Sequence, residues 1–185
     1  MPEISRAFAV WVTGLPASGK SVLTAALVKR FNERGLQSVV LESDALRKLF
    51  STETHYDDQD RDYFYGSIAF IGKVLTDQGL SVIFDATANK RAYRDRARRE
   101  ILQFLEVYVD TPLEVSMQRD PKGIYRKALS GEATHVPGIQ AEYEPPLKPD
   151  VVVHGDRENP DDASRRIVDA LDARGWLSPR ENRQQ

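Results

Sequence analysis

The sequence predicts an α/β fold in which a five-stranded parallel sheet is covered by helices on both faces. Short apolar runs alternate with helical patterns along most of the 185 residues, as in parallel sheets with helical crossovers. A glycine-rich loop follows the first apolar run and opens the first helical pattern. Acidic residues follow two other apolar runs, at the strand ends where open α/β sheets bind ligands.

Composition excludes several other classes of protein. Apolar residues make up 41% and charged residues 29% of the chain, which is typical of a globular protein. A net charge of −2 gives no basic surface for nucleic acid, and no apolar run approaches the ~20 residues of a membrane span. The absence of cysteine excludes disulfides and thiolate sites. We expect a cytoplasmic protein with a single domain over residues 1–177 and a frayed tail over 178–185.

Three strands are predicted in the first half of the chain, from the apolar runs over residues 9–12, 38–42 and 80–84. Each run is short enough for a buried strand. Polar residues 51–60 predict a loop. Helical patterns run from the glycine loop to Gly35, over 45–50, and over 59–78, where Phe64, Ile68, Ile71 and Leu75 form one apolar stripe that Gly79 ends.

The second half adds strands over residues 105–109 and 150–153. The arginine-rich run over 90–102 predicts a helix with a solvated face. Thr111-Pro112 has the signature of an N-cap followed by a first helical proline, and that helix should reach Arg119. A short helix ends near Leu129, and residues 130–149 resemble an ordered active-site loop. Asn159-Pro160 starts a final helix that ends at Gly175.

The glycine-rich loop fits the phosphate-binding pattern G-x-x-x-x-G-K-[ST]. Its glycines allow a tight turn whose N–H groups converge on phosphate oxygens, at the positive end of the following helix. The lysine would reach the β- and γ-phosphates, and the serine hydroxyl would bind Mg²⁺. With a strand before it and a helix after it, the loop predicts a P-loop NTPase fold that binds ATP through Gly14, Leu15, Pro16, Ala17, Ser18, Gly19, Lys20, Ser21 and Val22.

Carboxylates stand at the ends of the second and third predicted strands. Asp44 could orient and deprotonate an acceptor hydroxyl, or it could simply cap the helix that follows. Asp85 ends an apolar strand downstream of the phosphate loop, which is a Walker-B arrangement. Glu42 or Asp85 could support Mg²⁺ through water.

Several motifs resemble those of the adenylylsulfate kinases, over roughly residues 8 to 150. The segment Arg119-Asp-Pro-Lys-Gly-Ile-Tyr-Arg-Lys-Ala128 resembles that family's lid pattern R-D-x-K-G-L-Y-x-K-A. Residues 41–47 resemble L-D-G-D-N-V-R, residues 104–113 resemble F-x-E-V-x-V-x-x-P-L-E, and residues 138–146 resemble G-I-x-x-x-Y-E-x-P.

The resemblance implies a three-layer kinase with a lid, and transfer of the γ-phosphate of Mg·ATP to the 3′-hydroxyl of adenosine 5′-phosphosulfate in sulfate assimilation. It implies catalytic roles for Asp44 and Lys20, support of Mg²⁺ by Asp44 through water, and ATP contacts for Arg119 and Lys122. The partner is a small anionic nucleotide, and a homodimer is a further expectation. The positions expected to bind the acceptor are Asp44, Arg47, Arg61, Phe64, Asn89, Val136 and Ile139.

Departures from the family pattern lie on the acceptor side. Phe64 replaces an asparagine, and Val136 replaces the phenylalanine that stacks on the acceptor adenine. The family's D-G-D is Glu42-Ser43-Asp44 here, and its I-S-P segment is replaced by Asp85-Ala-Thr-Ala-Asn89. This last stretch looks more like the D-x-T-N of other small-metabolite P-loop kinases.

Other interpretations compete for the arginines. Arg47 could be a surface ion-pair residue, and Arg61 could pair with Asp57 or Asp58. Arg94 and Arg98 share a helix face within the Arg91–Arg99 cluster and could bind an anionic acceptor, but a solvated face is favoured. The three histidines have no metal-ligand spacing.

Three functions therefore remain open. The first is an adenylylsulfate kinase. The second is a related kinase for another small-molecule or nucleotide-derivative acceptor, which the acceptor-side departures favour. The third is a nucleotide-binding module without kinase activity.

Overall fold

The strands form one parallel sheet in the order β2-β3-β1-β4-β5: β1 (Ala9–Thr13), β2 (Ser38–Glu42), β3 (Ser81–Asp85), β4 (Phe104–Asp110) and β5 (Val151–His154). The helices are α1 (Lys20–Glu33), α2 (Ser43–Phe50), α3 (Asp58–Asp77), α4 (Arg91–Glu100), α5 (Leu113–Arg119), α6 (Ile124–Leu129) and α7 (Pro160–Ala173). This computed structural model describes residues 7–50 and 55–177. The predicted frayed tail over 178–185 lies outside the described residues.

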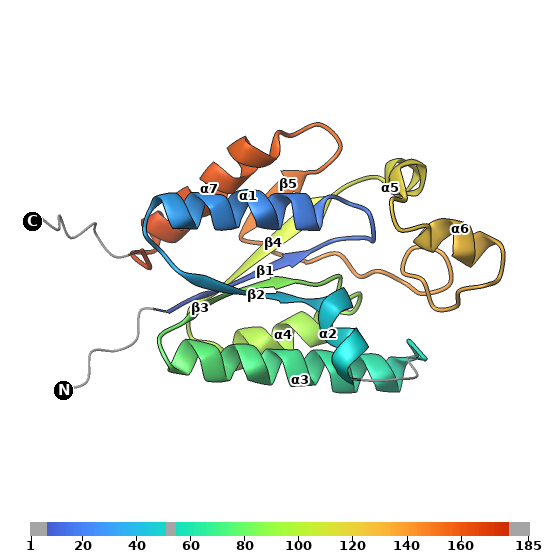
Figure 1. The fold of residues 1–185 in the computed structure, drawn as a ribbon, viewed down its shortest axis with the longest axis horizontal. Coiled ribbons are helices and arrows are strands. Elements are labelled where there is room, and N and C mark those ends of the chain that lie inside the picture. Colours follow the sequence, from blue (N-terminus) through green and yellow to red (C-terminus); the bar gives the residue numbers. More distant parts are fainter. Residues whose placement is uncertain (1–6, 51–54, 178–185) are drawn as a thin grey trace, which may run out of the picture.

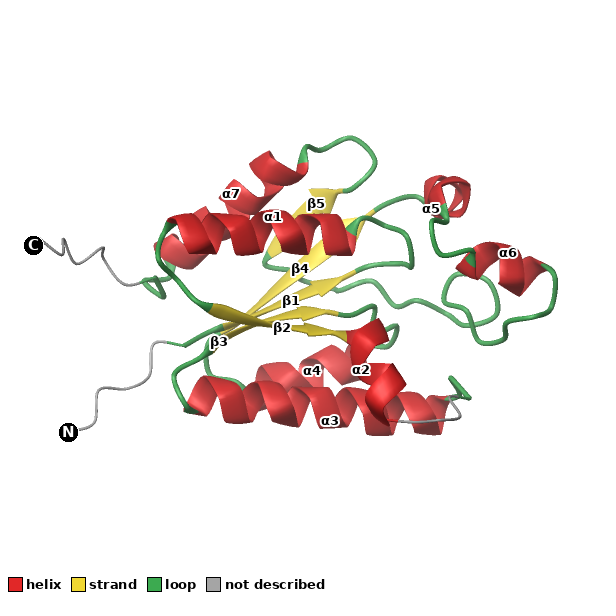
Figure 2. Ribbon diagram, in the orientation of Figure 1, coloured by secondary structure: helices red, strands yellow, loops and turns green. Residues whose placement is uncertain are grey.

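Helices cover both faces of the sheet, which confirms the predicted three layers. Helices α1 and α7 lie on one face, and α3 and α4 lie on the other (Figure 1). The short helices α2, α5 and α6 lie beyond the strands' carboxyl ends, toward which all the arrows point (Figure 2). This edge is where the connecting loops gather, so it is where a ligand site is expected.

Two apolar clusters form the core, one against each face of the sheet. β1 contributes to both because all five of its residues are buried. Trp11 stacks on Phe84 with ring centroids 4.4 Å apart, and its indole N–H donates to the Ala86 carbonyl at 3.1 Å. That bond satisfies the polar atom of an otherwise apolar side chain.

The predicted strand over 38–42 has the expected bounds, but the prediction that it is buried is wrong. β2 is an edge strand, and Val40 is 39% exposed. A short apolar run predicts a strand without saying whether neighbours cover both of its sides.

Helix starts agree with the sequence in two cases and differ in two others. The Asp57 side chain accepts from the Asp60 amide at the start of α3, and the Asn159 side chain accepts from the Asp161 amide at the start of α7. Thr111 was predicted to cap α5, and this is wrong, because its hydroxyl donates to the phosphate loop and the N-cap position falls one residue later. α2 begins two residues earlier than predicted.

The arginine-rich helix α4 is not simply a solvated face. Arg94 is 1% exposed and its Nε donates to Glu106 at 2.8 Å. Arg98 is half-buried and reaches both Glu106 and Asp150. The solvated-face prediction is therefore wrong for Arg94, because a carboxylate on β4 and two backbone carbonyls replace its water.

Within residues 7–50 and 55–177, the structure contains no helix that is long and apolar enough to cross a membrane.

Two glycines of α3 provide a matched test of core packing. A Cβ added to Gly72 would lie 2.2 Å from Cζ of the buried Phe84 ring. We expect Gly72→Ala to lower the free energy of unfolding by about 1–3 kcal/mol, because the ring has no space to move into. The control is Gly66→Ala, whose Cβ would meet the end of the flexible Arg96 side chain, at Nη1 and Cζ. Helix propensity should make this control neutral or stabilising by up to about 1 kcal/mol. Equal unfolding free energies for the two variants, measured in denaturant, would contradict the packing described.

Candidate active site

A cavity of about 750 Å³ opens at the carboxyl edge of the sheet. It is lined by the phosphate loop, the carboxyl ends of β2 and β3, the segment between α5 and α6, and the loop from β5 to α7. The sequence-predicted residues that line it are Pro16, Ala17, Gly19, Lys20, Ser21, Val22, Asp44, Asp85, Arg119 and Lys122.

The phosphate loop is shaped by its glycines and by its contact with β4. Gly14 has φ 156°, and a Cβ there would lie 2.6 Å from the Val109 carbonyl oxygen. Gly19 precedes α1 with φ 107°, and Ala17 adopts φ 58°, which is unusual for a residue with a side chain. Gly14, Leu15 and Ser18 were also predicted to bind ATP, but they do not line the cavity.

Lys20 points back into its own loop. Its Nζ donates to the carbonyls of Leu15 at 2.8 Å and Gly14 at 3.2 Å. Burial lowers its pKa from 10.5 to about 8, although the carboxylates of Asp85 and Asp44 act in the opposite direction. A cation held by carbonyl groups at the wall of the cavity can exchange them for phosphate oxygens.

Asp85 faces this lysine from the end of β3. Burial raises the pKa of its carboxyl, while Lys20 and a hydrogen bond from the Ser21 side chain lower it. Ser21 and Asp85 therefore lie side by side, as hydroxyl and carboxylate, at the cavity wall. This set of oxygen donors suits a hard cation such as Mg²⁺. The described residues contain no ready-made group of three or more acidic or histidine ligands, and an ion held mainly by phosphates and water needs none.

Asp44 stands in the first turn of α2 and is joined to the lid segment across the cavity. The Lys122 Nζ lies 2.5 Å from its Oδ2 and 3.9 Å from the Glu42 carboxylate. The hydrogen bond with Asp44 raises the pKa of Lys122. The structure thus brings together the carboxylate proposed for catalysis and a cation proposed for ATP.

Apart from Asp44, the residues expected to bind the acceptor lie outside the cavity lining. Arg47 is 6% exposed, and its guanidinium carbon lies 3.9 Å from the centroid of the Phe64 ring. Its Nη1 donates to Asp60 at 3.1 Å, while Nη2 is buried without a hydrogen-bond partner in the described residues. Arg47 does form an ion pair, but the alternative of a surface position is wrong.

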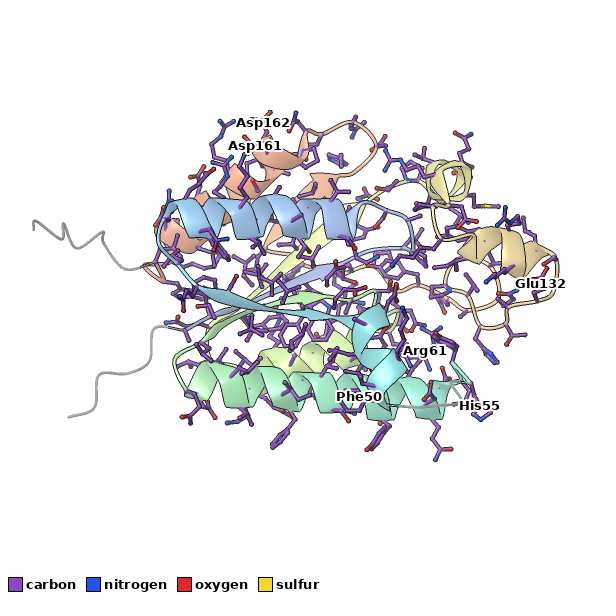
Figure 3. The ribbon with its side chains drawn as sticks, in the orientation of Figure 1. Phe50, His55, Arg61, Glu132, Asp161 and Asp162 are labelled. Carbon is purple, nitrogen blue, oxygen red and sulfur yellow. The ribbon has the colours of Figure 1, made fainter. Side chains whose placement is uncertain are left out.

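Arg61 is buried at the start of α3, on the side that faces α2 (Figure 3). It donates to the Asn89 side chain at 2.9 Å and to the carbonyls of Tyr56 at 2.8 Å and His135 at 2.6 Å. These bonds, and not ion pairs with Asp57 or Asp58, occupy its guanidinium. Arg61 and Asn89 therefore join three segments that are far apart in the sequence.

Val136 and Ile139 belong to a small apolar cluster with Tyr125 and Ala128 of α6. Val136 is 6% exposed. This cluster packs against the phosphate loop through Ala17, and the Tyr125 hydroxyl donates to the Pro16 carbonyl of that loop at 2.9 Å. Val136 is thus packed within the lid.

The sequence did not predict the cavity wall formed by residues 155–160, which connect β5 to α7. Gly155 also packs against the phosphate loop, where a Cβ would lie 2.4 Å from the Ser18 carbonyl oxygen. The sequence signal that could have indicated this wall is the position of the loop after the carboxyl end of β5, because ligands of open α/β sheets bind at that edge.

Comparison with known proteins decides the family. The family model for adenylylsulphate kinase matches residues 6–154. The chain belongs to the adenylylsulphate kinase family. An adenylyl-sulfate kinase from Gloeothece citriformis is 37% identical over 172 residues, which are 93% of this chain and 98% of that protein.

Solved structures agree with this family membership. The Mycobacterium tuberculosis APS kinase in complex with AMPPNP and APS is 32% identical with a TM-score of 0.84, and the match covers 90% of this chain and 98% of that one. An unliganded sugar kinase from Janibacter is 25% identical with a TM-score of 0.66, covering 94% of this chain and 99% of that one. The chain is therefore a P-loop kinase of the adenylylsulphate kinase family with the ATP-binding fold of these enzymes.

Nucleotide binding should depend on pH through Lys20. Its pKa of about 8 leaves it mainly charged below that pH and mainly neutral above it. Bound phosphates favour the charged form, so ATP affinity should fall as the pH rises through about 8 and binding there should take up protons. Calorimetry in buffers of different ionisation enthalpy should find little uptake near about pH 6.5 and a substantial fraction of a proton near about pH 8.5. Equal uptake at both pH values would contradict this assignment.

Proposed function

We propose that the protein phosphorylates the 3′-hydroxyl of adenosine 5′-phosphosulfate with Mg·ATP. One observation carries the proposal: the short helix α2 holds Asp44 and Arg47 three residues apart. Asp44 lines the cavity beside the phosphate loop, whereas Arg47 is buried, like Arg61, outside the cavity lining. Residues three apart lie on one helix face, so α2 would present a proton acceptor and an anion-binding cation to one substrate.

On the donor side, the phosphate loop would hold ATP and Lys20 would neutralise its β- and γ-phosphates. Bound Mg²⁺ would supply further neutralisation of the transferring phosphoryl group. The Ser21 hydroxyl would hold the ion, and Asp44 and Asp85 would support it through water. Arg119 and Lys122 would close over the nucleotide and exclude water.

On the acceptor side, Asp44 would orient the hydroxyl and accept its proton as the bond to phosphorus forms. Lys122 would release Asp44 and move to the phosphates. Arg47 would contribute its Nη2, which has no hydrogen-bond partner among the described residues, to an anionic acceptor. Arg61, Phe64, Asn89, Val136 and Ile139 would shape this side of the site.

A second candidate is phosphorylation of another small-molecule acceptor. It is favoured by the packing of Val136 inside the lid, by the placement of Phe64 beneath Arg47, and by the use of Asn89 to bind Arg61. The similarity to a sugar kinase is consistent with this candidate.

We also infer that residues 1–177 act as a single cytoplasmic kinase domain. A homodimer could form through the exposed apolar side chains of α3, where Tyr63 is 70% and Phe70 61% exposed. Large exposed apolar side chains on one helix are typical of an interface.

Release of ADP over an acceptor panel tests the substrate. Adenosine 5′-phosphosulfate should accelerate it roughly a hundredfold or more over the rate without acceptor, as positioned acid–base catalysis provides. The panel should include adenosine 5′-phosphate, sugar acids and other small alcohols. Acceleration by one of these alone would replace the first proposal with the second. Bound ATP without acceleration by any acceptor would indicate a binding module.

Replacement of Asp44 tests the proton acceptor. Asp44→Asn should lower kcat by roughly 10²–10⁴-fold while Mg·ATP still binds, because the amide cannot take a proton. Glu42→Gln is the matched control, since Glu42 also faces Lys122 but at 3.9 Å. It should retain most of the activity. Full transfer activity in Asp44→Asn, or equal losses in both variants, would rule out the proposed role.

A further inference from the structure

We propose that Arg94 is a positioning residue for the acceptor side: it holds Ala88 in a left-handed conformation and so fixes Thr87 and Asn89 beside the cavity. The inference rests on the proposed function for its kinetic consequence. Its structural basis is independent of the acceptor's identity.

The guanidinium of Arg94 binds three different parts of the chain. Its Nε donates to Glu106 of β4 at 2.8 Å, its Nη1 donates to the Ala88 carbonyl after β3, and its Nη2 donates to the Glu144 carbonyl at 2.7 Å. At 1% exposure it has almost no contact with water. The planar fork of arginine allows these directions at once, and a lysine could not reproduce them.

Ala88 is the strained member of this arrangement. Its φ of 41° lies in the left-handed region, which costs a residue with a side chain on the order of 1–3 kcal/mol. Surrounding bonds must therefore impose it. The Ala88 N–H donates to the Tyr65 hydroxyl at 3.0 Å, and Arg94 binds the carbonyl of the same residue.

The neighbours of Ala88 are those that reach the site. Thr87 lines the cavity, and its carbonyl accepts from the Thr13 hydroxyl at 2.6 Å, next to the phosphate loop. Asn89 binds Arg61 through its side chain, and its carbonyl accepts from the Glu144 amide at 2.7 Å. Arg94 thus holds both ends of the contact between residues 86–90 and residues 142–144.

Arg94→Lys and Arg98→Lys form a matched pair. The two arginines lie one helical turn apart, and both bind Glu106, with Arg98 at 3.0 Å. Arg98 donates to the carboxylates of Glu106 and Asp150. Arg94 also donates to the backbone carbonyls of Ala88 and Glu144, in the loops after β3 and before β5. Both variants keep the positive charge beside Glu106, so a difference between them reports the loop contacts.

Hydrogen–deuterium exchange tests the positioning role without any acceptor. Arg94→Lys should speed exchange over residues 86–90 and 142–145 by roughly tenfold or more. These segments would then open without first breaking the hydrogen bonds that Arg94 makes to Ala88 and Glu144. Arg98→Lys should leave these segments unchanged. Unchanged exchange in Arg94→Lys, or equal acceleration in both variants, would overturn the proposal.

Kinetics then test the consequence. In Arg94→Lys the KM for adenosine 5′-phosphosulfate should rise roughly tenfold while the KM for ATP stays within about twofold. Adding Ala88→Gly should recover at least about half of the lost kcat/KM, because glycine adopts the left-handed conformation without strain. A parallel rise in both KM values, or no recovery with glycine, would overturn the proposal. Wild-type inactivity with this acceptor would instead refute the proposed function, and the exchange result would still decide the role of Arg94.

Discussion

The phosphate loop lies against the ends of β4 and β5, and the rest of the site depends on this contact. The Ser18 carbonyl accepts from the Thr111 hydroxyl at 2.8 Å. Gly155 packs against both groups, and a Cβ on it would lie 2.4 Å from each of their oxygen atoms. A Cβ added to Gly14 would likewise lie 2.6 Å from the Val109 carbonyl oxygen. The loop is therefore held against residues at the carboxyl ends of two strands before any nucleotide binds, which reduces the ordering that binding would otherwise require.

Charge balance is the second organising feature of the site. Lys20 lies between its own carbonyl groups and the carboxylates of Asp85 and Asp44, and Lys122 reaches Asp44 from the lid. Burial acts most strongly on Lys20 and Asp85, which stabilise each other, whereas the side chains of Asp44 and Lys122 are 53% and 56% exposed. A nucleotide that brings phosphates and a metal would rearrange all four side chains, and this is how substrate binding would couple the lid to Asp44, the proposed proton acceptor.

Sequence reasoning succeeded where the signal is local. Strand and helix periods, the glycines of the phosphate loop and the cap at Asn159 are properties of adjacent residues, and the sheet follows from them. It failed where the partner is distant. Arg94 and Arg98 look alike in the sequence, yet Arg94 is buried by residues from β4 and from the loop near Glu144.

The same limit applies within the site. The phosphate-loop residues lie in one motif and were found together, whereas Arg47, Arg61 and Asn89 come from three separate segments. The bonds from Arg61 to Asn89 and to His135 span 28 and 74 positions. No spacing rule predicts such contacts.

Transfer of labelled phosphate tests most directly whether the ATP-binding side and the acceptor-binding side of the site, with Asp44 between them, form one kinase active site. ATP carrying a label in its γ-phosphate is incubated with Mg²⁺, the protein and adenosine 5′-phosphosulfate, and the products are separated. We expect the label in a nucleotide that carries it on the 3′-hydroxyl. Label recovered only as inorganic phosphate, at the same rate with and without acceptor, would contradict a kinase site built around these residues.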